Sequence, residues 1–123
     1  MGASQRSKGQ RGEREAAALL APLWPDARRG LTQSRGAEQA DVEGTPCWVE
    51  IKAGKRPLIR AALAQALRDT DGRPAMVLTK DDSPGGGKPA TWRVTMTLQD
   101  FARLIEAERY AAAQDAADGI GAR

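Results

Sequence analysis

The chain has 123 residues, enough for one domain with a single core, and its 41% hydrophobic and 28% charged content is ordinary for a globular protein. It has no histidine and one cysteine, which excludes Ser-His nucleophile systems, histidine zinc sites and an intramolecular disulfide. The net charge is only +3, yet the cations are clustered, and no apolar run reaches the length of a membrane span.

The beginning of the chain predicts a flexible basic arm followed by a helix. Residues 1–10 are rich in Gly, Ser, Gln and Arg and have no apolar periodicity, which is typical of an arm. From Gly12 to about Leu23 apolar residues recur three to four apart, as on one helix face, and two prolines end the helix. Residues 27–35 are a candidate for a first strand.

Residues 40–52 predict two short strands joined at Gly44-Thr45. In that register Val42 faces Cys47, Asp41 faces Trp48, and side chains alternate between the two faces. The predicted core face holds Ala40, Val42, Cys47, Val49 and Ile51. The other face holds Asp41, Glu43, Trp48, Glu50 and Lys52.

The second half predicts helix, strand, strand, helix. Pro57 starts an amphipathic helix that runs to about Leu67, followed by a buried strand at 75–80, a loop at 81–90 and a strand at 91–98. A last helix follows, with Leu98, Phe101, Leu104 and Ile105 on one stripe. We therefore expect an α/β domain over residues 11–110, a mixed sheet flanked by helices in the order α-β-β-β-α-β-β-α, and a frayed tail at 111–123.

The polar face of the hairpin has the composition of a metal-dependent site. In the predicted register Asp41 and Glu50 are diagonal neighbours, about 7 Å or less apart at Cβ, so both carboxylates can converge on one cation. Mg²⁺, or Mn²⁺ in its place, takes oxygen ligands and commonly uses one or two carboxylates with a substrate phosphate. Lys52 points the same way as Glu50 and can stabilise the charge that develops on a phosphate. Glu13 lies beside the buried stripe of the first helix, where an acid can equally serve the helix dipole.

The clustered cations suggest a polyanionic partner such as nucleic acid, although a solvated basic face explains charge alone equally well. Our candidates for contacts to a DNA backbone are Arg6, Lys8, Arg11, Arg35, Lys55 and Arg56.

The pattern of Asp41, eight residues, then Glu50-Ile51-Lys52 resembles the "D…ExK" signature of the PD-(D/E)xK nuclease superfamily, and "KGQRGEREAAALL" is similar to the start of archaeal-type Holliday junction resolvases and related phage and bacterial endonucleases. The resemblance implies a restriction-endonuclease-like core in which Asp41, Glu50 and the main-chain carbonyl of Ile51 bind Mg²⁺ or Mn²⁺. It also implies that Glu13 belongs to the site, that Lys52 is the catalytic lysine, and that the protein is a homodimer. Ala40 stands where the motif has proline.

The main hypothesis is a Mg²⁺-dependent endodeoxyribonuclease, a hydrolase acting on Holliday junctions or other branched DNA in recombination or repair. The alternatives are a non-catalytic nucleic-acid-binding module on the same fold and a structural protein that assembles through its last helix. We expect a cytoplasmic protein, bacterial, archaeal or phage-encoded, with no membrane partner.

Overall fold

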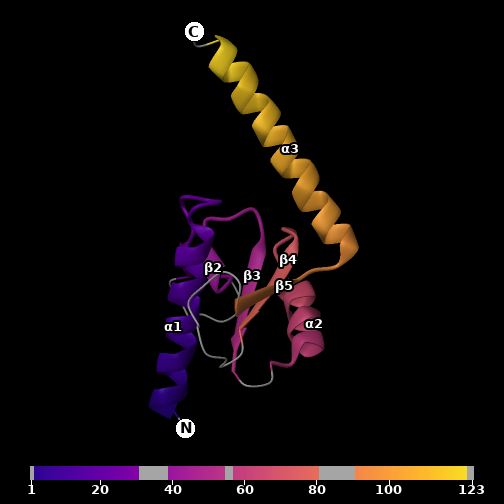
Figure 1. Cartoon of the computed structure of the whole chain (residues 1–123). Helices are drawn as coiled ribbons and strands as arrows, with labels where there is room; N and C mark the ends of the chain where they lie inside the picture. The colour runs from indigo at the N-terminus through magenta and orange to yellow at the C-terminus, as the bar shows by residue number, and fades with distance from the viewer. Residues whose placement is uncertain (1, 31–38, 55–56, 81–90, 122–123) are drawn as a thin grey trace.

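In the computed structural model the chain forms a five-stranded mixed sheet with three helices, described for residues 2–30, 39–54, 57–80 and 91–121. The elements are α1 (Gly2–Leu20), β1 (Arg28–Arg29), β2 (Val42–Glu43), β3 (Trp48–Ala53), α2 (Ile59–Asp69), β4 (Ala75–Lys80), β5 (Trp92–Thr95) and α3 (Leu98–Gly121). This confirms the predicted α/β class and the predicted order of elements (Figure 1).

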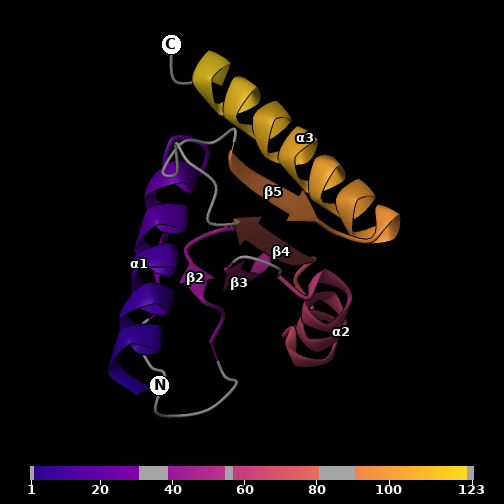
Figure 2. The ribbon, with the colours of Figure 1, turned by 60° about the horizontal axis from the view of Figure 1, so that its bottom comes forward.

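The strands lie in chain order across the sheet, from β1 to β5. The strands β1, β2 and β3 form an antiparallel meander, β3 and β4 are parallel, and β5 returns antiparallel to β4. A parallel pair needs a crossover connection, and α2 supplies it. Figure 2 shows α1 and α2 on opposite sides of the sheet.

Each face of the sheet has its own apolar cluster. On the α1 side, Ala16, Ala17 and Leu20 pack on alternate residues of β3 and β4, such as Val49 and Met76. On the α2 side the buried residues are Ala40, Trp48, Ala62, Ala66, Ala75 and Val77. Small alanines let α2 approach the sheet closely, and Trp48 supplies most of the volume on that side.

The helices differ from the prediction at their ends. The helix α1 begins at Gly2, within the stretch predicted as an arm, and stops at Leu20, so Leu23 is 67% exposed. The helix α3 continues to Gly121, through the predicted tail. The predicted apolar stripe of α3 is wrong in part, because Leu104 is buried whereas Leu98 and Phe101 are exposed.

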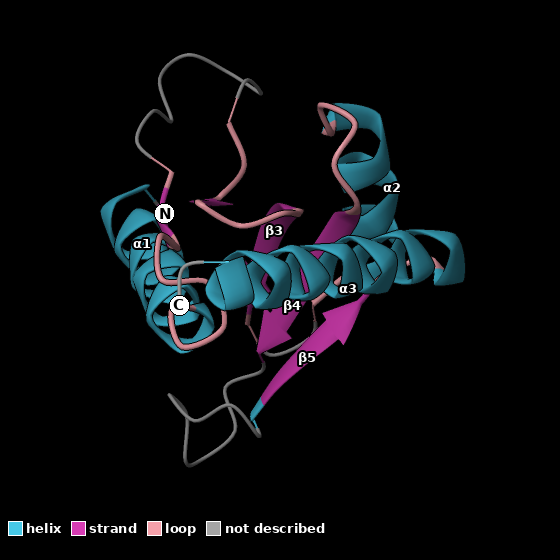
Figure 3. Ribbon diagram, turned by 90° about the horizontal axis from the view of Figure 1, so that it is seen from above, coloured by secondary structure: helices cyan, strands magenta, loops and turns pink. Residues whose placement is uncertain are grey.

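The position of α3 explains that error. Seen from above, it passes across the ends of β3 and β4 rather than along a face of the sheet (Figure 3), so only a short part of one side meets the core. Its first turns are held by Asp100, whose Oδ2 accepts the main-chain N–H of Ala75 at 3.1 Å. No helix in the described part of the chain is long and apolar enough to cross a membrane.

Candidate functional site

The hairpin register differs from the prediction by two residues. Val42 pairs with Val49, not with Cys47, so the connection spans Gly44–Cys47 instead of a two-residue turn. Two features force the longer turn: Pro46 has no N–H for a ladder, and Thr45 Oγ1 accepts the N–H of Cys47 at 3.1 Å. A shift of two residues leaves every β3 side chain on its predicted face.

Asp41 occupies an irregular point just before β2. Its main-chain N–H donates to the carbonyl of Val49 at 2.9 Å, and its Oδ2 accepts the N–H of Ile51 at 2.8 Å. The main chain and the side chain of Asp41 thus contact β3 on either side of Glu50. The regular pairing of β2 with β3 stops at this point, and Ala40 lies with Trp48 in the cluster on the α2 side. The prediction that Ala40 shares a face with Val42 is therefore wrong.

Glu50 is buried on β3, at 8% exposure, and its carboxylate is held by its own strand. Its Oε1 accepts the indole N–H of Trp48 at 3.0 Å. The Asp41 and Glu50 side chains lie close enough for Glu50 to raise the pKa of the Asp41 carboxyl. One oxygen of each carboxyl group is therefore fixed by an N–H from β3, and the two groups meet.

Burial raises the pKa of the Asp41 carboxyl to about 7, and the charge of Glu50 adds to the rise. The N–H of Ile51 and the ammonium of Lys52 act in the opposite direction. Lys52 is half-buried two residues beyond Glu50, on the same face, and pairs in register with the buried Thr79 of β4. The sequence-predicted trio of Asp41, Glu50 and Lys52 is therefore brought together.

Glu13 approaches this group from α1 but has a partner of its own. It is 8% exposed, its Oε1 accepts the Nε–H of Arg29 at 3.2 Å, and its pKa is raised by burial and by the charge of Asp41. Among the residues with described side chains, no three acids or cysteines gather closely enough to hold a metal ion. Asp41 and Glu50 are thus the two neighbouring carboxyl groups of the site. Glu13 lies near Asp41 but forms an ion pair with Arg29.

Two neighbouring carboxyl groups, each with one oxygen held by an N–H of β3, form a donor set that fits Mg²⁺ or Mn²⁺, which commonly uses one or two carboxylates. The third predicted ligand is the main-chain carbonyl of Ile51, which follows Glu50 in β3. Cys47 is fully buried, and burial raises the pKa of its thiol to about 11, so it stays protonated and serves packing.

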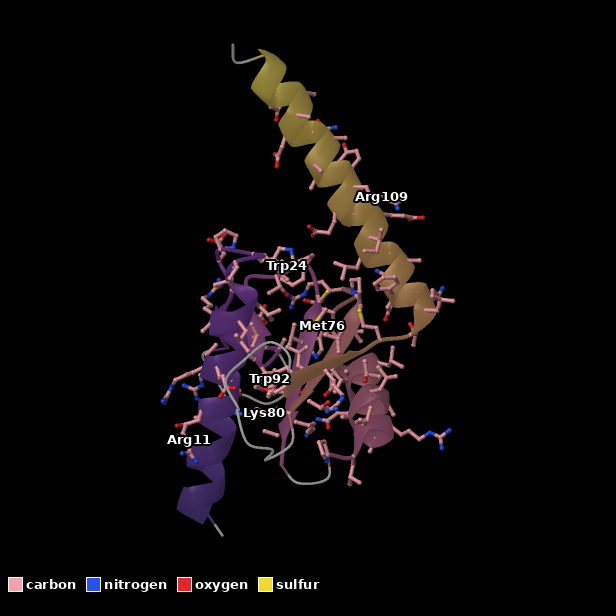
Figure 4. All side chains as sticks on the ribbon, viewed as in Figure 1. Arg11, Trp24, Met76, Lys80, Trp92 and Arg109 are labelled. Carbon is pink, nitrogen blue, oxygen red and sulfur yellow. The ribbon has the colours of Figure 1, made fainter. Side chains whose placement is uncertain are left out.

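The predicted DNA contacts are described only at Arg11, which is exposed on α1 (Figure 4). The adjacent Gly12 packs on the end of β3, since a Cβ there would lie 3.6 Å from side-chain atoms of Ile51 and Ala53. Arg11 thus lies near the end of β3 that carries Lys52. Arg35, Lys55 and Arg56 lie outside the described residues, as do the side chains of Arg6 and Lys8.

Two further features belong to the opposite, α1-facing side of the sheet. Lys80 Nζ donates to Glu15 at 2.9 Å and lies 5.9 Å from the centroid of the Trp92 ring (Figure 4), so it points away from the Glu50 face. An apolar hollow of about 170 Å³ lies between α1 and the last two strands. Its lining is Ala16, Leu19, Leu20, Leu23, Leu78, Trp92 and Val94, none of which supplies acid–base chemistry.

Sequence reasoning missed three residues around the site: Trp48 and Arg29 bond to its carboxylates, and Arg73 lies over the Trp48 ring. Trp48 lies on the predicted face with Glu50 and is buried there, and its i, i+2 relation to Glu50 indicates the hydrogen bond. Nothing local indicates the bond of Arg29 to Glu13 or the bond of Arg73 to Glu43, because these partners lie 16 and 30 residues away in the chain.

Comparison of the chain with protein-family models, with curated proteins and with solved structures finds no match.

Proposed function

We propose that the protein is a metal-dependent endodeoxyribonuclease with a restriction-endonuclease-like core. The observation that carries the proposal is the meeting of Asp41 and Glu50, each with one oxygen held by β3, with Lys52 next on the same face. Among the predicted DNA contacts, Arg11 is the one whose side chain the structure describes. It is exposed near the end of β3, which supports DNA as the polyanionic substrate.

Each residue has a distinct role in this proposal. Asp41, Glu50 and the Ile51 carbonyl would hold Mg²⁺ or Mn²⁺, which when bound would lower the pKa of water and polarise a phosphate oxygen. The Lys52 ammonium would stabilise the negative charge that develops on the phosphate during attack. Glu13, held by Arg29, would add a third acidic side chain beside Asp41. Histidine plays no part, because the chain has none.

We extend the proposal to branched DNA such as Holliday junctions, and to a homodimer whose two sites cut opposing strands. Both follow from the resemblance of "KGQRGEREAAALL" and of the D…ExK pattern to archaeal-type Holliday junction resolvases and related endonucleases. Labelled duplex, flap, fork and four-way-junction substrates, each incubated with and without Mg²⁺, test the first. Sedimentation of the free protein and of its junction complex tests the second.

The test of the function itself uses Asp41→Asn and Glu50→Gln. We expect both variants to lose Mg²⁺-dependent plasmid nicking by about a hundredfold or more while DNA binding survives, because each loses a metal-holding carboxylate but no phosphate-contacting cation. Nicking and gel-shift assays on the same preparations measure both properties.

The matched control is Glu15→Gln, a partly buried glutamate on the opposite side of the sheet, which should cleave like the unmodified protein. Full cleavage by either Asp41→Asn or Glu50→Gln would contradict the proposal. Salt-sensitive binding by the unmodified protein, with no cleavage in Mg²⁺ or Mn²⁺, would instead indicate the non-catalytic binding module.

A further inference from the structure

Each of the three tryptophans in the chain donates its indole N–H to a glutamate. Trp24 donates to Glu108 of α3 at 3.2 Å, and Trp92 donates to Glu15 of α1 at 2.9 Å. Both of these bonds join distant elements. Trp48 differs, because its acceptor, Glu50, lies on the same strand and belongs to the proposed metal site.

The indole ring of Trp48 is fixed from several sides. It is 1% exposed, packed among Ala40, Ala62, Ala66 and Val77 of the α2-side cluster. The guanidinium of Arg73 lies 5.5 Å from the ring centroid, within the range of a cation–π contact. A ring held in this way cannot turn to follow the carboxylate, so the carboxylate takes its orientation from the ring.

Arg73 is itself held in place by three partners. It donates to Asp71 at 2.9 Å, to Glu43 at 3.0 Å and to the carbonyl of Cys47 at 3.3 Å. It therefore ties the turn before β4 to both ends of the hairpin connection, directly over Trp48. The path from Arg73 through Trp48 to Glu50 is continuous at contact distance.

We propose that Trp48 is a positioning residue that orients Glu50 for metal binding, with Arg73 bracing its ring. The inference rests on the proposed function. An N–H on Oε1 holds one oxygen of Glu50 and leaves the other for a cation. Such outer partners of a metal ligand typically change metal affinity by 10–100-fold when removed.

The variant that tests this is Trp48→Phe, which keeps an aromatic ring and removes the indole N–H. We expect the Mn²⁺ concentration for half-maximal cleavage, and the calorimetric Kd for Mn²⁺, to rise about tenfold, while cleavage at saturating Mn²⁺ returns to within about threefold of the unmodified rate. Trp92→Phe is the matched control, since it removes the same kind of bond outside the site, and its Mn²⁺ dependence should not change.

A measurement on the unmodified chain covers the case in which Trp48→Phe fails to fold. The three indole N–H groups give three NMR signals, and titration with Mg²⁺ should shift that of Trp48 more than those of Trp24 and Trp92.

The outcomes separate the two proposals. Cleavage that depends on Asp41 and Glu50, with an unchanged Mn²⁺ dependence in Trp48→Phe, overturns the positioning role alone. A Trp48 signal that stays still while calorimetry detects Mg²⁺ binding also overturns it. Absence of both metal binding and cleavage in the unmodified protein overturns the proposed function and this inference together.

Discussion

At the scale of single residues, the site depends on what each carboxyl group meets. Asp41 is partly buried beside Glu50, and its raised pKa of about 7 means that this carboxyl keeps its proton up to near neutral pH. Glu13 is as buried as Glu50 but has an arginine partner. The same side-chain chemistry thus gives two neighbouring acids in one place and an ion pair in the other.

The raised pKa of Asp41 makes the stability of the metal-free protein depend on pH. Between pH 4 and pH 7 the folded Asp41 keeps a proton that the unfolded chain has lost, so the free energy of unfolding falls as pH rises through this range. We expect a loss of about 2–4 kcal/mol from this group, absent in Asp41→Asn. Urea unfolding in EDTA at pH 5 and pH 8 measures it, and an equal loss in Asp41→Asn would contradict the assignment.

At the scale of elements, the position of Asp41 depends on how closely β1 approaches the start of β2. The N–H of Gly30 donates to the carbonyl of Asp41 at 2.9 Å, and a Cβ on Gly30 would lie 2.2 Å from the main-chain oxygen of Ala40. A second close approach occurs at Gly44, where φ is +82° and a Cβ would lie 1.9 Å from the oxygen of Asp26. Glycine at these two points lets the meander close around the site.

Gly30→Ala should therefore disturb both stability and the site. The clash is with backbone, which cannot rotate away, so we expect destabilisation of about 2–3 kcal/mol and reduced cleavage as Asp41 is displaced. Thermal unfolding and a nicking assay measure the two effects. Gly119→Ala, in an open part of α3, is the control and should be neutral or slightly stabilising. If Gly30→Ala were as stable as that control, the prediction would be wrong, because β1 could then shift away from Ala40 without loss of stability.

At the scale of the whole molecule, the sheet and the first two helices form a body from which α3 extends. The two termini lie at opposite ends of the molecule (Figure 1). Figure 4 shows Trp24 between the end of α1 and α3, and its bond to Glu108 is the last contact along α3 for which the structure gives a distance. From Glu106 to Gly119 every side chain is exposed, so this part of the helix contributes little to the core.

Truncation after Arg109 should consequently leave the domain intact. We expect its melting temperature to change by about 2 °C or less, because every removed side chain from Tyr110 to Gly119 is exposed. Leu104→Ala is the contrasting change: this buried residue joins α3 to the core, and its truncation should cost about 2–3 kcal/mol. Calorimetric scans of both proteins measure the difference. A truncated protein that unfolds at much lower temperature would mean that the distal helix is stabilised by contacts with another chain.

Much of the fold could be predicted because it depends on local periodicity. Alternation along residues 48–52 places Trp48, Glu50 and Lys52 on one face whatever the register, and the 3.6-residue pattern in residues 59–67 indicates a helix of the right length for a crossover. Backbone geometry imposes a period of two residues on every strand and of 3.6 residues on every helix, so both patterns can be recognised from the sequence alone. The sequence alone therefore predicts that Glu50 and Lys52 share a face near Asp41.

Only the tertiary structure decided how those groups are held. The contact of Asp41 with the N–H of Ile51, the bond of Arg29 to Glu13 and the stacking of Arg73 on Trp48 join residues 10, 16 and 25 positions apart. The departure of α3 from the sheet likewise turned Leu98 and Phe101 outward, despite their helical spacing. Such pairings depend on loop length, on close backbone approach at glycine and on which buried charges find partners. These are properties of the assembled chain, whereas alternation and helical period are properties of each segment.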